Sequence, residues 1–389
     1  MRGLWCERGM RSFDDELQEL RAASLLRSLR HVESPQQPQV TVDGRPLVNF
    51  SSNDYLGLAS APAVREALIR GIAQWGAGAG ASRLVCGTQS PHAALEDALA
   101  AFKGTEAALT FSSGYAAAVG TLTALLRPED TVILDKLCHA SLIDGARLSG
   151  ATLRVYPHNK TERLAEILET VRAKAPVNAR VLVVTESIFS MDGDRAPLVE
   201  IAALARHHGA LLMVDEAHSL GICGPEGRGL AHGDGITPDI QMGTLSKAAG
   251  LHGGYICGSR PMVDVLINKA RSFIYSTAPP PAVAAAACTV VRDILPGPEG
   301  ETRRRRLWEN VSRFTRGMSL DLAQSAIVPV VIGGEEEAMA RSRALLEDGF
   351  LIPAIRYPTV ARGSARLRVT FSAAHETADV DALVSRLLR

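Results

Sequence analysis

The sequence has no excess of charge of either sign and no long apolar run. Its 42 basic and 42 acidic residues cancel, so no overall field attracts nucleic acid or an anionic membrane surface. No window approaches the roughly 20 apolar residues of a membrane-spanning helix. The N-terminus also lacks the uninterrupted apolar segment of an export signal. These absences favour a cytoplasmic protein whose partners are small molecules, with no role for nucleic acid or membrane.

Closely spaced cysteines are absent as well. The six cysteines are scattered, without the spacing of a disulfide framework or a zinc site. They are Cys6, Cys86, Cys138, Cys223, Cys257 and Cys288. Free thiols are typical of a reducing compartment, so we expect a cytoplasmic protein with no metal site.

The length predicts more than one lobe. The 389 residues exceed the roughly 250 to 300 at which a single hydrophobic core stops growing. We expect an N-terminal arm of a helix and a hairpin over residues 1–50, a large domain over 51–295, and a small C-terminal domain over 296–389. The last boundary is placed at the turn-forming run Leu295-Pro296-Gly297-Pro298.

Two elements are expected in the arm. Apolar residues recur at helical spacing from Phe13 to Arg30, which predicts an amphipathic helix. The dipeptide Asp43-Gly44 supplies the positive φ angles of a tight turn and predicts a hairpin over Val40 to Val48. The alternative start Met10 lies just before this pattern, which the first nine residues do not join.

From residue 107 onward, short apolar runs alternate with amphipathic helical patterns. Several runs are continuously apolar, as in a mostly parallel sheet covered by helices on both faces. The expected strands are Ala107–Phe111, Thr131–Leu134, Thr152–Tyr156, Val181–Thr185, Ala210–Val214, Ile240–Gly243 and Gly254–Cys257 in the large domain, and Ala326–Ile332, Phe350–Ile355 and Arg366–Phe371 in the small one. The predicted fold class is therefore α/β, with a smaller α/β C-terminal domain.

A nicotinamide-dependent dehydrogenase would fit this alternation, but its fingerprint is missing. A dinucleotide-binding glycine motif lies between a strand and a helix. The glycine-rich run Gly76-Ala77-Gly78-Ala79-Gly80 instead follows the helix predicted over Ala63 to Trp75. Because the glycine run is in the wrong place, we reject a dehydrogenase. The α/β alternation alone does not support one, since fold class does not give function.

Polar residues follow several of the predicted strands directly. In an α/β sheet, ligands bind beyond the carboxyl ends of the strands, so these segments are expected to meet at one edge. They are Ser112 to Tyr115, Asp135 to Ser141, Glu186 to Asp194, Asp215 to Ser219 and Thr244 to Lys247. Together they place acids, two histidines, a lysine and hydroxyls beside one another.

This set suits pyridoxal 5′-phosphate. The cofactor needs a lysine for its imine, a carboxylate beside the pyridine nitrogen, and donors around its phosphate. Lys247 and Asp215 supply the first two, and the helix that begins near Gly114 aims free N–H groups at an anion. A serine hydrolase would need a Gly-x-Ser-x-Gly elbow, which the sequence lacks.

Five ordered segments resemble the α-oxoamine synthases, a family of fold-type I pyridoxal-phosphate enzymes. The likeness runs from about Phe13 to the C-terminus. Its segments are Asn49–Leu58, Phe189–Asp194, Val214–His218, Thr244–Tyr255 and Tyr275–Pro280.

The resemblance implies roles for four catalytic residues. Lys247 would form the imine and move protons at the substrate Cα. Asp215 would pair with the pyridinium nitrogen, and His218 would bind the phenolic oxygen of the cofactor. His139 would stack on the ring face.

The resemblance also implies further contacts to cofactor and substrate. The cofactor-binding residues would be Gly114, Tyr115, Ser190, Thr244 and Ser246. The resemblance also implies a homodimer with shared active sites, in which Ser276 and Thr277 would reach the phosphate bound by the neighbouring subunit. The substrate-binding residues would be Arg27, Arg356 and Thr359. An arginine at position 356 suits a carboxylate because its guanidinium binds one in bidentate fashion.

The implied reaction is the decarboxylative condensation of L-alanine with a pimeloyl thioester of coenzyme A or an acyl-carrier protein, a step of biotin biosynthesis. Three positions depart from the expected pattern, at Cys138, Tyr115 and Tyr357, and none removes a group that the chemistry needs.

The stretch Arg83–Gln89 is similar instead to the branch that joins glycine to acetyl-CoA. That branch, and a non-catalytic relative that only binds the cofactor, remain alternatives.

Overall fold

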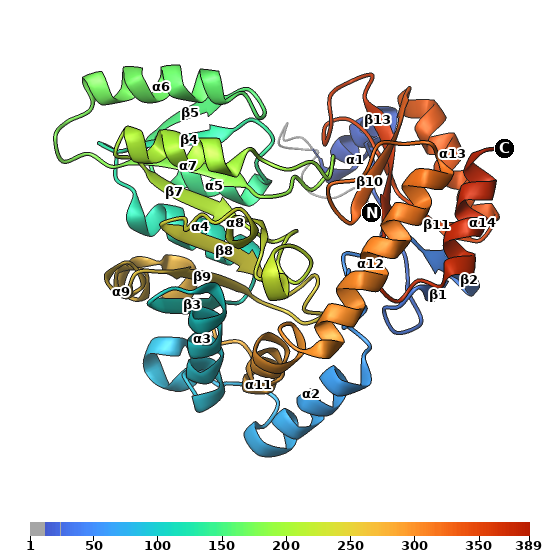
Figure 1. Ribbon diagram of the computed structural model, residues 1–389, viewed down its shortest axis with the longest axis horizontal. Helices are drawn as coiled ribbons and strands as arrows, with labels where there is room; N and C mark the ends of the chain where they lie inside the picture. The colour runs from blue at the N-terminus through green and yellow to red at the C-terminus, as the bar shows by residue number, and fades with distance from the viewer. Residues whose placement is uncertain (1–11, 24) are drawn as a thin grey trace.

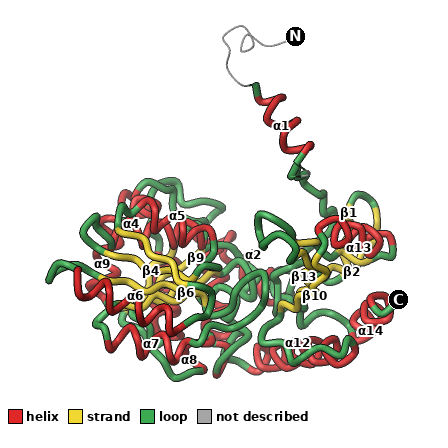
Figure 2. The backbone as a smooth tube through the Cα atoms, turned by 90° about the horizontal axis from the view of Figure 1, so that it is seen from above, coloured by secondary structure: helices red, strands yellow, loops and turns green. Residues whose placement is uncertain are grey.

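The computed structural model describes residues 12–23 and 25–389. The beginning of the predicted arm, with Cys6 and Met10, lies outside them. Helix α1 (Phe13–Ala22) begins at a capping box of Ser12 and Asp15 and buries none of its side chains. It projects from the rest of the chain (Figure 2). The prediction of a helix as far as Arg30 is wrong, because a short helix without tertiary packing is only marginally stable.

The predicted hairpin is confirmed. Strands β1 (Gln39–Val42) and β2 (Arg45–Asn49) pair in antiparallel fashion, and the turn residues Asp43 and Gly44 have φ angles of 48° and 73°. Strand β2 also pairs in parallel with β11 (Phe350–Leu351) near the C-terminus. The hairpin is therefore joined to the last third of the chain.

A seven-stranded sheet forms the centre of the large domain, in the order β3-β9-β8-β7-β6-β4-β5. Only β9 runs antiparallel to its neighbours. The strands are β3 (Ala107–Phe111), β4 (Thr131–Asp135), β5 (Thr152–Tyr156), β6 (Val181–Glu186), β7 (Leu211–Asp215), β8 (Ile240–Thr244) and β9 (Gly254–Gly258). The predicted α/β fold with a mostly parallel sheet is confirmed.

Helices cover both faces of this sheet (Figures 1 and 2). One face packs against α4 (Gly114–Leu125), α5 (Ala140–Leu148), α9 (Arg260–Lys269) and α10 (Arg271–Ile274). The other packs against α3 (Ser90–Lys103), α6 (Thr161–Lys174), α7 (Leu198–His207) and α11 (Pro281–Thr289). The remaining helical segments of this part are α2 (Pro62–Trp75), η2 (Arg83–Gly87), η3 (Pro225–Gly227), α8 (Leu230–Gly233) and η4 (Val290–Ile294).

The C-terminal part begins with the long helix α12 (Pro298–Gly317) and carries a second sheet in the order β10-β13-β12. Its other elements are β10 (Ile327–Gly333), α13 (Glu335–Glu347), β12 (Ala354–Ile355), β13 (Ala365–Thr370) and α14 (Thr377–Leu387). The single strand predicted over Phe350–Ile355 is wrong, because Ile352 and Pro353 separate β11 from β12 and the two strands join different sheets. The division of the chain at residue 296 stays a prediction.

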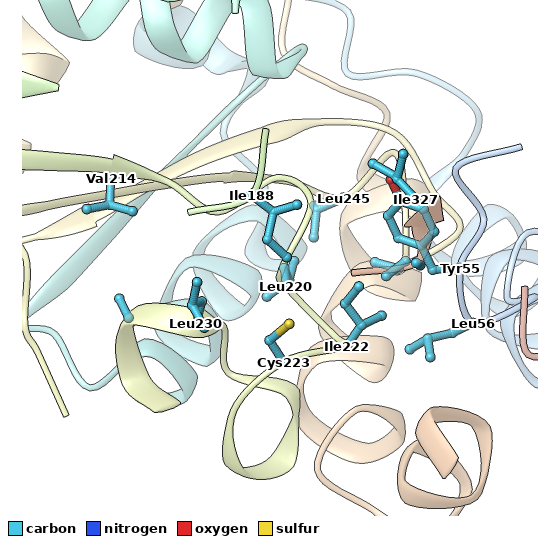
Figure 3. Packing of buried hydrophobic residues seen from close by; sticks show 14 of the residues in the cluster. Tyr55, Leu56, Ile188, Val214, Leu220, Ile222, Cys223, Leu230, Leu245 and Ile327 are labelled. Atoms are coloured by element: carbon cyan, nitrogen blue, oxygen red, sulfur yellow. The ribbon is translucent and has the colours of Figure 1, made fainter. Parts of the chain in front are cut away.

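One hydrophobic cluster joins the two parts beneath the carboxyl ends of the strands (Figure 3). Val214 of β7 and Leu245 after β8 lie in it with Tyr55 of the 49–58 loop and Ile327 of β10. All four side chains are at most 2% exposed. Close packing of this kind resists displacement, so the loops above the cluster have a fixed base. No helix in the described part of the chain is long and apolar enough to span a lipid bilayer.

Candidate active site

The ends of three neighbouring strands bring the predicted side chains together. Asp215 is the last residue of β7, and it is paired in register with Glu186, the last residue of β6. On its other side Asp215 pairs with Met242 of β8, and Lys247 lies three residues beyond the end of that strand. The expectation that these residues meet at one edge of the sheet is confirmed.

Lys247 lies close to a histidine and to carboxyl groups. Its Nζ is 2.9 Å from Nε2 of His218. Burial lowers the pKa of Lys247 to about 8, although Asp215 and Glu186 act in the opposite direction. About one amine in ten is therefore uncharged near pH 7. The uncharged amine is the form that reacts with a carbonyl group.

The imidazole of His218 connects Lys247 to a buried tyrosine. Tyr55 Oη lies 2.5 Å from His218 Nδ1. Burial raises the pKa of Tyr55 to about 12, while burial and the charge of Lys247 hold the pKa of His218 well below its usual value. The hydroxyl thus keeps its proton and the imidazole is neutral, so the three groups form a hydrogen-bonded chain.

Two buried carboxyl groups face this chain. Asp215 accepts a hydrogen bond of 2.9 Å from the backbone of Ala217, and Glu186 accepts one from the backbone of His139. Burial raises the pKa of both carboxyl groups, and Lys247 lowers it. A cation beside Asp215 would keep that carboxylate ionised, because an unpaired charge is costly in the interior.

A second group of residues, here called the cradle, lies at the N-terminus of helix α4, where free backbone N–H groups would attract an anion. Helix α4 begins at Gly114 with no acidic residue in its first turn, and its N-cap is Ser113. On the neighbouring strand, a Cβ atom at Gly254 would lie 2.6 Å from the backbone nitrogen of Gly114. Only glycine fits there. Thr244 Oγ1 donates to the carbonyl of Gly253 and lies 3.0 Å from Ser246 Oγ.

Three further predicted cofactor contacts lie on the segments that follow β3, β4 and β6. Tyr115 is half exposed, and its hydroxyl donates a hydrogen bond of 2.7 Å to Asp144. His139 is exposed at the start of α5, with Nδ1 2.8 Å from Ser141 Oγ. Ser190 is partly buried, and its carbonyl accepts a hydrogen bond from Arg368.

Other predicted residues are not joined to this group by hydrogen bonds in the described part of the chain. Thr277 forms an isolated β-bridge with Ser82, and Ser276 precedes it. Arg27 is exposed on the segment after α1, Arg356 is partly buried, and Thr359 is exposed. The roles predicted for these five residues, like those of the other site residues, stay predictions.

Sequence reasoning missed Arg368. This side chain is only 6% exposed and donates to three neutral oxygens, those of the Ser190 carbonyl, the Thr370 hydroxyl and the Asn53 side chain. Its positive charge lowers the pKa of Lys247. The sequence signal was an arginine inside an apolar strand, since a buried arginine is rare without a functional or paired role.

The residues present fit pyridoxal 5′-phosphate. Lys247 is an amine with a lowered pKa, Asp215 is a buried carboxyl group that faces this lysine and His139, and helix α4 begins at Gly114 with no acidic residue in its first turn. Amine, carboxylate and helix terminus are the donor set of a pyridoxal-phosphate enzyme. Together with the doubly covered sheet, they define a pyridoxal-phosphate-dependent enzyme of fold type I.

Comparisons with known proteins agree with this class. The family model for aminotransferase class I and II matches residues 45–387. An 8-amino-7-oxononanoate synthase from Geobacter sulfurreducens is 47% identical over 97% of both chains, and one from Methylococcus capsulatus is 49% identical over 95% of this chain and 96% of its own. A serine palmitoyltransferase from S. paucimobilis, solved with PLP and myriocin, has a TM-score of 0.89 at 31% identity over 99% of this chain and 97% of its own.

The chain therefore belongs to the aminotransferase class I and II family and, within it, to the α-oxoamine synthases, which are pyridoxal-phosphate-dependent transferases. The resemblance found from the five sequence segments is confirmed.

Proposed function

We propose that the protein condenses L-alanine with a pimeloyl thioester and releases carbon dioxide, giving 8-amino-7-oxononanoate for biotin biosynthesis. The observation that carries this proposal is the chain Tyr55–His218–Lys247 beside Asp215 at the strand ends. It occurs in a protein that is 47% identical over 97% of its length to a synthase of that name.

The residues around Lys247 are suited to moving a proton at the alanine Cα. When bound, pyridoxal phosphate withdraws electrons from that carbon. Lys247 has a pKa of about 8, so its amine takes and returns a proton near neutral pH. His218 orients the amine through Nε2, and Tyr55 fixes the imidazole from the other side. Asp215 would balance positive charge on the pyridine nitrogen when the cofactor is bound, and His139 would cover the ring, as the family resemblance implies.

Arginines are proposed to hold the carboxylate of alanine until it leaves. Arg356 is one, as the family resemblance implies. Arg368 is a second candidate, because its contacts are to neutral oxygens and its guanidinium retains N–H donors. Arg27 and Thr359 are proposed as further substrate contacts, as the family resemblance implies. The acyl carrier is coenzyme A or an acyl-carrier protein.

We also propose a homodimer in which Ser276 and Thr277 reach the phosphate site of the second subunit. The surface beside them is apolar: Leu84, Val85 and Tyr275 are 53%, 79% and 71% exposed. Large exposed apolar side chains grouped in this way favour an interface. Sedimentation should give the mass of two chains, and Val85→Asp should shift that mass toward one chain.

A cytoplasmic location accords with the free cysteines of the described residues.

The proposed function is tested by a product assay. The protein, loaded with pyridoxal phosphate, is incubated with L-alanine, glycine or serine, each with pimeloyl-CoA, a pimeloyl carrier protein or acetyl-CoA, and the products are identified by mass spectrometry. We expect 8-amino-7-oxononanoate from alanine and a pimeloyl thioester. Turnover of only glycine and acetyl-CoA would identify 2-amino-3-ketobutyrate CoA ligase activity, which the Arg83–Gln89 stretch raised, and would overturn the proposal.

A further inference from the structure

His158 is bound between two carboxylates in a part of the site edge that the proposed chemistry does not use. Its Nδ1 lies 2.9 Å from Asp135 and its Nε2 lies 2.7 Å from Asp194. Both ring nitrogens therefore face acceptors, and only the doubly protonated imidazolium donates to both. The ring also packs edge-on against Phe189 at 4.4 Å between centroids.

The two carboxylates belong to separate segments of the large domain. Asp135 is the fully buried end of β4, whereas Asp194 closes the loop over residues 189–195, here called the junction loop. Asn159, next to His158, repeats the connection: its backbone N–H donates to Asp135 and its side chain donates to Asp194. The strand end and the junction loop are thus tied together twice.

The junction loop carries Ser190, which is assigned to the cofactor. Two backbone hydrogen bonds close it, from Phe189 N to Asp194 O at 3.0 Å and from Gly193 N to Phe189 O at 2.8 Å. Because the loop is closed, the position of Asp194 fixes the position of Ser190.

The opposite side of the junction loop is bound to the C-terminal sheet. Arg366 forms an ion pair with Asp192, and Arg368 donates to the Ser190 carbonyl at 2.6 Å. Gly193 is packed so closely that a Cβ atom there would lie 2.7 Å from Ser325 Oγ. A shift of the loop would therefore move Arg368, which lies near Lys247, as well as Ser190.

We propose that His158 is a positioning residue whose imidazolium, held between Asp135 and Asp194, fixes the junction loop and through it Ser190 and Arg368. The inference rests on the proposed function for the assignment of Ser190 and Arg368 to cofactor and substrate. His158 touches neither and acts only through the loop.

The charge state of His158 gives the proposal a pH signature. The two carboxylates outweigh partial burial and raise the pKa of His158 to about 9. An ordinary histidine has a pKa of about 6.5. The bridge that His158 forms between Asp135 and Asp194, here called the clamp, therefore contributes stability that is complete below about pH 6.5 and is lost as the pH rises through about 9. Asp135 and Asp194 hydrogen-bond the ring, and the uncharged Phe189 packs against it.

The test compares His158→Gln with His207→Gln, an exposed histidine at the end of α7, just before β7 begins. Cofactor affinity of the apo-protein is measured by equilibrium titration, and kcat and KM for alanine are measured separately. We expect His158→Gln to weaken cofactor binding about tenfold, as for one lost charge-assisted hydrogen bond, and to raise KM more than it lowers kcat. Equal affinity in the two variants would overturn the proposal.

Two further measurements keep the proposal testable if His158→Gln does not fold. The imidazole of the wild-type protein should titrate near pH 9 by NMR, and Asp194→Asn should move that titration down and weaken cofactor binding. Titration near pH 6.5 in the wild type, or unchanged affinity in Asp194→Asn, would contradict the clamp. The cofactor and NMR measurements need no turnover, so a failure of the product assay would leave them valid.

Discussion

The lowered pKa of Lys247 leads to a quantitative prediction about cofactor uptake. With a pKa of about 8, about one amine in ten is uncharged near pH 7. At the ordinary lysine pKa of 10.5, only about three in ten thousand would be uncharged. Burial therefore increases the reactive form about 300-fold near neutral pH.

This prediction is tested by the pH dependence of the reaction between the apo-protein and pyridoxal phosphate. The rate, followed by visible absorbance, should rise about tenfold per pH unit below pH 8 and then level off. The rate of the same reaction with Nα-acetyl-lysine, expressed per uncharged amine, corrects for ionisation of the cofactor itself. A corrected rate that keeps rising to about pH 10 would show that Lys247 has an ordinary pKa and would refute the reasoning.

Two substitutions should move this plateau in opposite directions. Asp215→Asn removes a carboxylate that raises the pKa of Lys247, so the plateau should begin at lower pH. Arg368→Gln removes a positive charge that lowers the pKa, so the plateau should begin at higher pH. Arg343→Gln, on the exposed face of α13, is the matched control and should leave the profile unchanged. Shifts of the wrong sign would contradict the assigned charges.

Three further predictions concern the cradle, the core and the lysine. Gly254→Ala should weaken cofactor binding about tenfold, because overpacking costs about 1 to 3 kcal/mol. The control Gly78→Ala, at a position with open space around it, should leave binding unchanged. Equilibrium titration of the apo-proteins with the cofactor measures both. Lys103→Met leaves the fully buried Glu216 without its cationic partner and should lower the free energy of unfolding by about 3 to 5 kcal/mol. The double variant Lys103→Met/Glu216→Gln should recover part of this loss, and urea unfolding measures both. Borohydride reduction of the loaded protein should fix the cofactor to Lys247, which peptide mass spectra would show. Cofactor fixed only to other lysines would contradict the assignment of Lys247.

The sheet and the centre of the site were predictable because each follows from a local pattern. Apolar runs such as Val181–Thr185 are long enough for a buried strand and too short for a core helix. Since parallel strands end at the same edge, Asp215 and Lys247 were expected to meet, and they do. The neighbouring Tyr55 lay in a segment singled out for its aromatic residues, but its bond to His218 joins positions 163 residues apart.

The remaining features depend on contacts that no local pattern encodes. The apolar run Phe350–Ile355 reads as one strand, yet its halves pair with β2 and β13 in different sheets. Arg368 reads as part of a strand, and its importance appears only because β13 packs beside the Ser190 carbonyl. The end of α1 at Ala22 reflects missing tertiary support rather than a stop signal.

The most direct test of the central claim follows the carboxyl carbon of alanine. Carboxyl-labelled L-alanine and pimeloyl-CoA are added to the loaded protein, and labelled carbon dioxide and 8-amino-7-oxononanoate are measured together. The account predicts that the two appear in equal amounts, and that both disappear in Lys247→Ala. An amino-ketone that retains the label, or product formation that survives Lys247→Ala, would contradict it.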